Sequence, residues 1–323
     1  MFKEIRNPDL YHGVNRKKNF FEGWYFKIVD KNCDNVFAFI PGIAKGNSLK
    51  FNHSFIQVLD GKKVKYNYIK FNSSSFKFKK DKFSIAIEDN NFSLSGISLN
   101  INNEKDNISG NIKFENVKKW PDSIVNPGSM GFYNYLTFME CYSHVCCIDG
   151  NIIGGLNING DYIDFTGGKV YIEKNWGRSF PKSWIWIQSN SFDNKRVAFT
   201  CSIGRVPFIC TTFSGFLVSI MVEDKFYKFT TINRSKMKII KKDNDVNIVF
   251  TKGRLNLNVM TYSNKYEFIQ CKGPKDGNMI PLVDESLNGK ITVELFNNKI
   301  NETIFKGVGN CAGIEYGGEM QIL

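Results

Sequence analysis

Apolar and polar residues alternate with a period of two along most of the chain. The alternation is clear in Phe83-Ser84-Ile85-Ala86-Ile87, in Leu255-Asn256-Leu257-Asn258-Val259 and in Ile291-Thr292-Val293-Glu294-Leu295. Such a pattern predicts half-buried strands, because successive side chains of a strand point to opposite faces. Turn signals of Asn, Asp and Gly recur about every 8–12 residues, the spacing of antiparallel sandwiches and barrels. Sustained helical periodicity is absent, so the sequence predicts an all-β protein.

The chain also contains two similar halves, which we interpret as an internal duplication. An ungapped alignment of the halves sets these residues against each other: Trp24 and Trp184, Phe39 and Phe199, Ile43 and Ile203. Each half has seven or more expected strands, enough to close an antiparallel barrel of about eight. With a break at Gly167-Gly168, we expect one β-barrel domain over residues 1–168 and a second over residues 169–323. The stretch 120–128 is expected to be a lid or crossover within the first domain.

Composition and charge narrow the range of partners. The chain carries a net charge of +12, but its basic residues are mostly lysines scattered over turns and strand exteriors. We therefore expect no nucleic-acid partner, and peripheral contact with an anionic membrane surface is the second explanation of the charge. The N-terminus leads into no apolar signal region, and irregularly spaced cysteines in apolar runs indicate reduced thiols. These features predict a cytoplasmic protein. The alternative is a cytoplasmic protein that binds peripherally to the membrane surface.

Acidic and aromatic residues share strand faces at several places, and 29 phenylalanines favour a lipophilic pocket. Because residues two apart lie on one face, four faces combine large rings with a few polar groups. The residues that we expect to line a cavity wall from these faces are Glu22, Trp24 and Phe26; His53 and Gln57; Glu140, Tyr142 and His144; and Trp184, Trp186 and Gln188. Mostly apolar walls with a few placed polar groups are typical of ligand sites.

Glu22, Glu140 and Glu173 can each be read in two ways. Each is either a structural carboxylate that caps a turn or pairs with a basic residue, or a desolvated acid. A carboxyl buried among aromatic rings has a raised pKa and can donate a proton near neutral pH. The run around Cys141 and His144 matches no standard zinc spacing, so we expect no metal.

Several segments together resemble the tocopherol cyclase family. They are Phe21-Glu22-Gly23-Trp24-Tyr25-Phe26-Lys27, Asn52-His53-Ser54-Phe55-Ile56-Gln57, Phe138-Met139-Glu140-Cys141-Tyr142-Ser143-His144, Glu173-Lys174-Asn175-Trp176-Gly177, Phe180-Pro181, Trp184-Ile185-Trp186 and Cys311-Ala312-Gly313-Ile314-Glu315. The Glu-Gly-Trp-Tyr and Glu-Lys-Asn-Trp-Gly blocks are the specific ones. The resemblance implies a lipocalin-like fold with two β-barrel domains and a lipophilic small-molecule substrate.

The activity that the resemblance implies is closure of the chroman ring of a prenylated quinol. An acid protonates the alkene, the phenolic oxygen attacks the resulting cation, and no cofactor is needed. From the residues we hypothesise that Glu22 or Glu173 is the proton donor and that the Glu140–His144 pair binds the quinol hydroxyl. The residues that would stabilise the cation are Trp24, Trp176, Trp184 and Trp186, through cation–π contacts.

Two other functions fit the same residues. A non-catalytic carrier of a lipid or isoprenoid would have the same aromatic walls but would tolerate Glu22→Gln and Glu173→Gln. An isoprenoid hydratase would use water as the nucleophile in place of the phenol. The sequence leaves open the native substrate, the stereochemistry and the oligomeric state.

Overall fold

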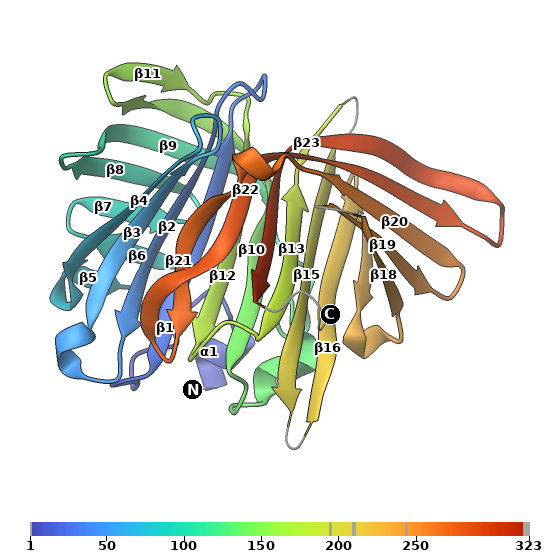
Figure 1. Cartoon of the computed structure of the whole chain (residues 1–323), viewed down its shortest axis with the longest axis horizontal. Coiled ribbons are helices and arrows are strands. Elements are labelled where there is room, and N and C mark those ends of the chain that lie inside the picture. The colour runs from blue at the N-terminus through green and yellow to red at the C-terminus, as the bar shows by residue number, and fades with distance from the viewer. Residues whose placement is uncertain (1, 194–195, 209–210, 243–244, 319–323) are drawn as a thin grey trace. The chain divides into compact units, whose positions relative to one another are not determined.

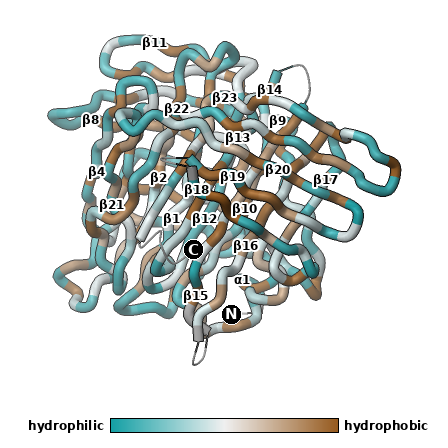
Figure 2. The backbone as a smooth tube through the Cα atoms, turned by 45° about the vertical axis from the view of Figure 1, so that its right-hand side comes forward, coloured by the Kyte–Doolittle hydropathy of each residue, from teal (hydrophilic) through white to brown (hydrophobic). Residues whose placement is uncertain are grey.

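The computed structural model describes residues 2–193, 196–208, 211–242 and 245–318, and it divides the chain into two units. The first unit comprises Met1–Phe180 with Cys271–Leu282, and the second comprises Pro181–Gln270 with Val283–Leu323. Apart from one five-residue helix and short 3₁₀ segments, the regular elements of the described residues are strands, which confirms the all-β prediction (Figure 1). Along many strands the backbone alternates between hydrophobic and hydrophilic positions, as the period of two requires (Figure 2).

The first unit is built on one antiparallel sheet with the strand order β4-β3-β2-β1-β12-β10-β9-β8-β7-β6-β5, and β11 pairs with β10. Its elements are α1 (Phe2–Arg6), β1 (Phe20–Val29), β2 (Val36–Lys45), η1 (Leu49–Phe51), β3 (His53–Asp60), β4 (Lys65–Asn72), η2 (Ser73–Ser75), β5 (Phe76–Phe78), β6 (Ser84–Ile87), β7 (Asn90–Ser93), β8 (Gly96–Asn102), β9 (Asn107–Lys118), η3 (Gly131–Tyr135), β10 (Cys141–Ile158), β11 (Asp161–Asp164) and β12 (Lys169–Gly177).

The sheet of the first unit curls until strands far apart in its order meet across an aromatic interior. Trp24 of β1 stacks on Phe76 of β5, with ring centroids 6.1 Å apart. Phe26 lies 5.5 Å from Phe92 of β7 and 6.2 Å from Phe114 of β9. We call this the inner face of the first sheet, and the opposite face the outer face. Rings of this size bury enough apolar surface to hold the curled sheet together.

The second unit has the strand order β17-β16-β15-β13-β23-β22-β20-β19-β18. Its elements are β13 (Ser183–Ser189), β14 (Ser191–Phe192), β15 (Val197–Phe208), β16 (Thr211–Val222), β17 (Lys225–Thr230), η4 (Thr231–Asn233), β18 (Lys236–Lys242), β19 (Asp245–Lys252), β20 (Leu255–Tyr262), η5 (Lys265–Glu267), β21 (Ile269–Lys275), β22 (Asn278–Asn297) and β23 (Glu302–Gly318). Its core includes Ile185, Phe199, Phe229 and Phe250.

The two sheets repeat one topology. The order β4-β3-β2-β1-β12-β10-β9-β8-β7 corresponds strand for strand to the order of the second unit, which supports the duplication. The ungapped residue alignment, however, does not preserve strand faces. In the first sheet Ile43 pairs with Glu22, so its side chain is on the same face as Trp24. In the second sheet Ile203 pairs with Ile185, so its side chain is on the other face from Trp184. A change of one residue in register moves every side chain of a strand to the other face.

The division between the units differs from the boundary expected after residue 168. The strand β12, which follows that point, lies between β1 and β10 in the first sheet. The first unit therefore runs to Phe180, and it also includes Cys271–Leu282, part of which is in β21. The paired glycines mark a turn before β12, because Gly167 has a φ of +82°, rather than the end of a domain.

Candidate functional site: two faces of one sheet

The central strands of the first sheet bring most of the predicted residues together. The register of β1, β12 and β10 sets Glu22 opposite Trp176, and Trp176 opposite Tyr142. Trp24 lies opposite Lys174, which in turn lies opposite His144. These six side chains therefore share the inner face, since paired residues of adjacent strands point to the same side.

A buried ion pair forms the centre of the inner face. The ammonium of Lys174 lies 2.6 Å from Oε1 of Glu22, and both side chains have no exposed surface. The same ammonium lies 5.1 Å from the ring centroid of Trp24 and 4.6 Å from that of Trp176. Two aromatic faces and a carboxylate thus stabilise one cation out of contact with water.

Backbone and side-chain groups of the N-terminal segment complete the partners of Lys174. Its ammonium donates to the carbonyl oxygens of Pro8 (2.8 Å) and Leu10, and it lies 2.8 Å from Nδ1 of His12. The amide of His12 donates to Glu22 at 2.8 Å. The ring of His12 stacks on the ring of Trp176, with centroids 4.2 Å apart. The ring of Tyr142 also stacks on Trp176, with centroids 5.2 Å apart.

Electrostatics make Glu22 a base and not an acid. Burial alone would raise its pKa, but the ammonium of Lys174 and the hydrogen bonds of His12 hold the pKa below its usual range. Burial lowers the pKa of Lys174, an effect that Glu22 opposes. Burial and the charge of Lys174 also lower the pKa of His12. The prediction of a raised pKa is therefore wrong for Glu22, because a cation lies in direct contact with it.

A second polar group links the N-terminal segment to the sheet. Nε2 of His144 lies 3.0 Å from Oδ1 of Asp9, and the other carboxylate oxygen of Asp9 accepts from Lys119. Burial would raise the pKa of Asp9, but His144 and Lys119 hold it well below its usual range. The expected Glu140–His144 pair is thus replaced by Asp9–His144. Glu140 precedes β10, and its carbonyl accepts from the amides of Arg178 and Ser179.

Asp9, His144 and Cys146 also meet the spacing of a metal site, since their ligand atoms all lie within 4.8 Å of one another. Their hydrogen bonds do not suit ligation. The amide of Ser129 donates to Nδ1 of His144, so Nε2 carries the ring proton and donates to Asp9. Burial also raises the pKa of the Cys146 thiol well above its usual range, which disfavours the thiolate that a metal requires.

The outer face of the same strands carries Glu173. Its carboxylate accepts from Tyr171 Oη at 2.6 Å, from Ser143 Oγ at 2.9 Å and from Asn175 Nδ2 at 3.2 Å. Its side chain lies opposite Tyr25 of β1, and the residue is only 3% exposed. These three donors, two hydroxyls and an amide, are neutral groups.

His53 and Gln57 of β3 also lie on the outer face. The ring of Phe55, between them in the strand, lies across Gly42, where a Cβ atom would be only 2.4 Å from the ring. Gly42 in turn pairs with Gly23, so two neighbouring glycines leave room for Phe55. The predicted residues of the first unit are therefore divided, with Glu22, Trp24, Phe26, Tyr142, His144 and Trp176 on the inner face and His53, Gln57 and Glu173 on the outer face.

Trp184, Trp186 and Gln188 belong to the second unit. All three are buried, and they alternate with Ile185 and Ile187, which point into the core of that unit. The indole of Trp184 donates to Oε2 of Glu315 at 3.0 Å. They therefore line the face of β13 that points away from the core of the second unit, as the strand alternation predicted.

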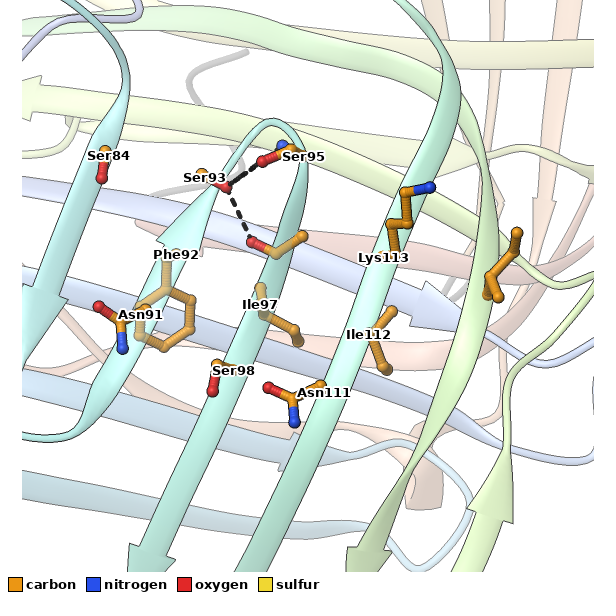
Figure 3. A pocket seen from close by; sticks show the side chains of 12 residues that line it. Ser84, Asn91, Phe92, Ser93, Ser95, Ile97, Ser98, Asn111, Ile112 and Lys113 are labelled. Atoms are coloured by element: carbon orange, nitrogen blue, oxygen red, sulfur yellow. Dashed lines mark hydrogen bonds between the residues drawn. The ribbon is translucent and has the colours of Figure 1, made fainter.

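A hollow of about 350 Å³ lies on the strands β6 to β10 of the first unit (Figure 3). The polar residues that line it include Ser84, Asn91, Ser98 and Asn111, and Ser93 binds Ser95 at 2.9 Å. None of the predicted site residues lines this hollow. Its apolar lining residues are Phe92, Ile97, Ile112 and Ile153, so the hollow combines apolar side chains with hydroxyl and amide groups.

The predicted site residues do not include four residues of the inner cluster, namely Asp9, His12, Lys119 and Lys174. Lys174 lies inside the quoted Glu-Lys-Asn-Trp-Gly block, and its alternation with Trp176 on one strand is the signal that could have identified it. Asp9 and Lys119 lie in segments without alternation, so their sequence carries no comparable signal.

Comparison with known proteins gives one family. A family model described as tocopherol cyclase-like matches residues 89–318. A rice protein (Oryza sativa subsp. japonica) named "Probable tocopherol cyclase, chloroplastic" is 33% identical over 31% of this chain and 22% of its own length. The chloroplastic tocopherol cyclase of Zea mays is 23% identical over 58% of this chain and 41% of its own length. The chain thus spans less than half the length of these curated relatives.

Solved structures agree on the fold. The structure of CghA with Sch210972 has a TM-score of 0.60 at 9% identity and covers 93% of this chain and 89% of its own. Kievitone hydratase from Nectria haematococca has a TM-score of 0.51 at 12% identity and covers 97% of this chain and 94% of its own. At such identities the likeness shows the lipocalin-like fold alone. No helix in the described part of the chain is long and apolar enough to cross a bilayer.

Proposed function

Because the chain belongs to the tocopherol cyclase-like family, we propose that it is a cofactor-free isomerase that closes a ring in a prenylated quinol or a related isoprenoid phenol. The observation that carries this proposal is Glu173, a carboxyl that is 3% exposed and is held by neutral hydroxyl and amide groups. A buried carboxyl of this kind can serve as a general acid toward an apolar substrate.

The reaction neither adds nor removes atoms. The carboxyl of Glu173 gives its proton to one carbon of the trisubstituted alkene, and the positive charge develops on the tertiary carbon. The phenolic oxygen then attacks that carbon to form the new C–O bond. The phenolic proton returns to the carboxylate, which restores the starting state of the enzyme.

Glu22 is a poor proton donor for an electrostatic reason. The ammonium of Lys174, 2.6 Å from Glu22, stabilises the carboxylate and opposes its protonation. Glu173 accepts hydrogen bonds from the hydroxyls of Ser143 and Tyr171 and from the amide of Asn175. A neutral hydrogen-bond donor stabilises a carboxylate less than a full positive charge does.

The outer face also offers aromatic surface beside Glu173. Tyr25 is its direct neighbour across β1 and β12, and Tyr171 lies two residues away on the same strand. Both rings are at least nine-tenths buried. The face of a desolvated ring stabilises a nearby cation by roughly 2 kcal/mol. Exclusion of water from this face would protect the tertiary cation from hydration.

The test is to incubate the purified protein with geranylgeranyl-benzoquinol under reducing conditions and to separate the products by chromatography with mass detection. We expect a product of unchanged mass, formed as one stereoisomer and lost with Glu173→Gln. The control variant is Glu115→Gln, which changes an exposed glutamate paired with Lys113 and should leave turnover intact.

The other outcomes assign the other functions. A product heavier by one water would identify a hydratase, and bound but unchanged quinol would identify a carrier. Full turnover by Glu173→Gln would show that another group donates the proton.

A further inference from the structure

The loops at one end of the first sheet carry a concentration of exposed apolar side chains. β1 begins, β2 ends, β3 begins and β12 ends at this end, because Phe20 pairs with Lys45, Ala44 with His53, and Phe21 with Gly177. In Figure 1 this is the edge at which α1 lies, opposite to β11. The exposed apolar residues of these loops are Val14, Leu49, Phe51, Ile124, Val125, Phe132 and Phe138.

The exposure of these side chains is large for apolar groups. Leu49 is 77% exposed, Ile124 71%, Val125 69% and Phe138 60%. Single exposed apolar residues are common on soluble proteins, but several on neighbouring loops indicate a binding surface. We call these loops, comprising residues 14–18, 49–51, 124–125, 132 and 138, the apolar rim.

Basic residues alternate with apolar ones in the rim. Arg16, Lys17 and Lys18 follow Val14 after one asparagine, and all of them are exposed. Lys50 lies between Leu49 and Phe51, with its ammonium 5.0 Å from the ring centroid of Phe51. The two loops adjoin, because Lys45 at the end of β2 donates to the carbonyl oxygens of Gly13 and Arg16.

We propose that the apolar rim docks the protein on an anionic phospholipid surface. The apolar side chains would enter the boundary between headgroups and acyl chains, while the adjacent lysines and arginines would bind lipid phosphates. The rim consists of separate loop tips and not of a continuous groove, which suits a fluid bilayer better than the fixed relief of a protein partner. The net charge of +12 supports the same partner.

Vesicle sedimentation tests this proposal in the whole protein. The probes are vesicles of phosphatidylcholine alone and vesicles in which about a quarter of the lipid is phosphatidylglycerol. We expect binding to the anionic vesicles, weakened by salt because the lysines are exposed. Lys17→Glu/Lys18→Glu should lower the partition constant by about fivefold for each charge removed, or more. Leu49→Ser/Phe51→Ser should lower it at both low and high salt.

Matched variants at the other end of the same unit serve as controls. Lys62→Glu/Lys63→Glu makes the same change of net charge in the turn between β3 and β4, and Tyr162→Ser removes a 65% exposed ring from β11. Neither should change binding by more than about twofold. Equal losses for Lys62→Glu/Lys63→Glu and Lys17→Glu/Lys18→Glu would overturn the proposal, as would no binding to anionic vesicles.

The docking proposal stands apart from the proposed reaction. Glu173→Gln should bind vesicles as the parent protein does, because Glu173 is buried and lies outside the rim. Loss of ring closure with retained vesicle binding would therefore concern the chemistry alone.

Discussion

Glu22 and Glu173 lie on adjacent strands of one sheet, but the two faces give them different environments. Glu22, on the inner face, contacts the backbone amide of His12 and an ammonium that itself lies over two indole rings. Glu173, on the outer face, contacts two hydroxyls and an amide. The inner carboxylate is thus fixed as an anion that ties the N-terminal segment to the sheet.

Replacing Glu22 should have the largest effect on stability. Glu22→Gln leaves the ammonium of Lys174 buried without its carboxylate, and we expect the free energy of unfolding to fall by about 3–5 kcal/mol. Glu173→Gln keeps a polar group beside the two hydroxyls and the amide that bind the carboxylate, and its cost should stay below about 2 kcal/mol. Urea denaturation of both variants measures the difference.

A double variant separates the charge effect from packing. Glu22→Gln/Lys174→Met removes both charges and should recover part of the lost stability, since no unpaired ion remains. Equal losses for Glu22→Gln and Glu173→Gln would contradict the distinction between the faces.

Asp9→Asn should have an intermediate effect. The substitution keeps an acceptor for His144 but removes the charge that pairs with Lys119, at a cost of about 1–3 kcal/mol. It should also speed tryptic cleavage at the exposed residues 16–18, because the N-terminal segment loses one of its attachments to the rest of the first unit. Asp34→Asn, at an exposed turn, is the control, and unchanged cleavage in Asp9→Asn would show that the remaining attachments suffice.

The smallest expected effect is a difference in acid sensitivity. The pKa of Glu22 is lowered from 4.5 and that of Asp9 from 3.8, so the unfolded chain binds protons more readily than the folded one. Their contribution to stability is therefore present above about pH 4.5 and is lost as the pH falls through the folded-state values. The variant Glu22→Gln/Lys174→Met should lose stability less steeply below pH 4.5 than the parent protein, as thermal unfolding at several pH values can measure. Parallel curves would show that Glu22 is not the group that titrates.

The alternation of apolar and polar residues was sufficient to predict the all-β fold and the shared face of Glu22 and Trp24. The division of the site between two faces was not visible in it, because the face of a residue depends on register with strands elsewhere in the chain. Glu173 and Trp176 occur in one short block, yet they differ by an odd number of positions and so point to opposite sides. Asp9 meets His144 only after β10 has joined the sheet, a contact that no local pattern encodes.

The attachment of residues 8–12 to Lys174 orders events during synthesis. Lys174, whose ammonium binds the carbonyl oxygens of Pro8 and Leu10, is translated only after β1 to β11 and the first half of β12. Closing such a long loop is entropically unfavourable, so the first residues to be made are among the last to be secured. Until then the carboxylate of Glu22 lacks the ammonium of Lys174, its partner in the buried ion pair.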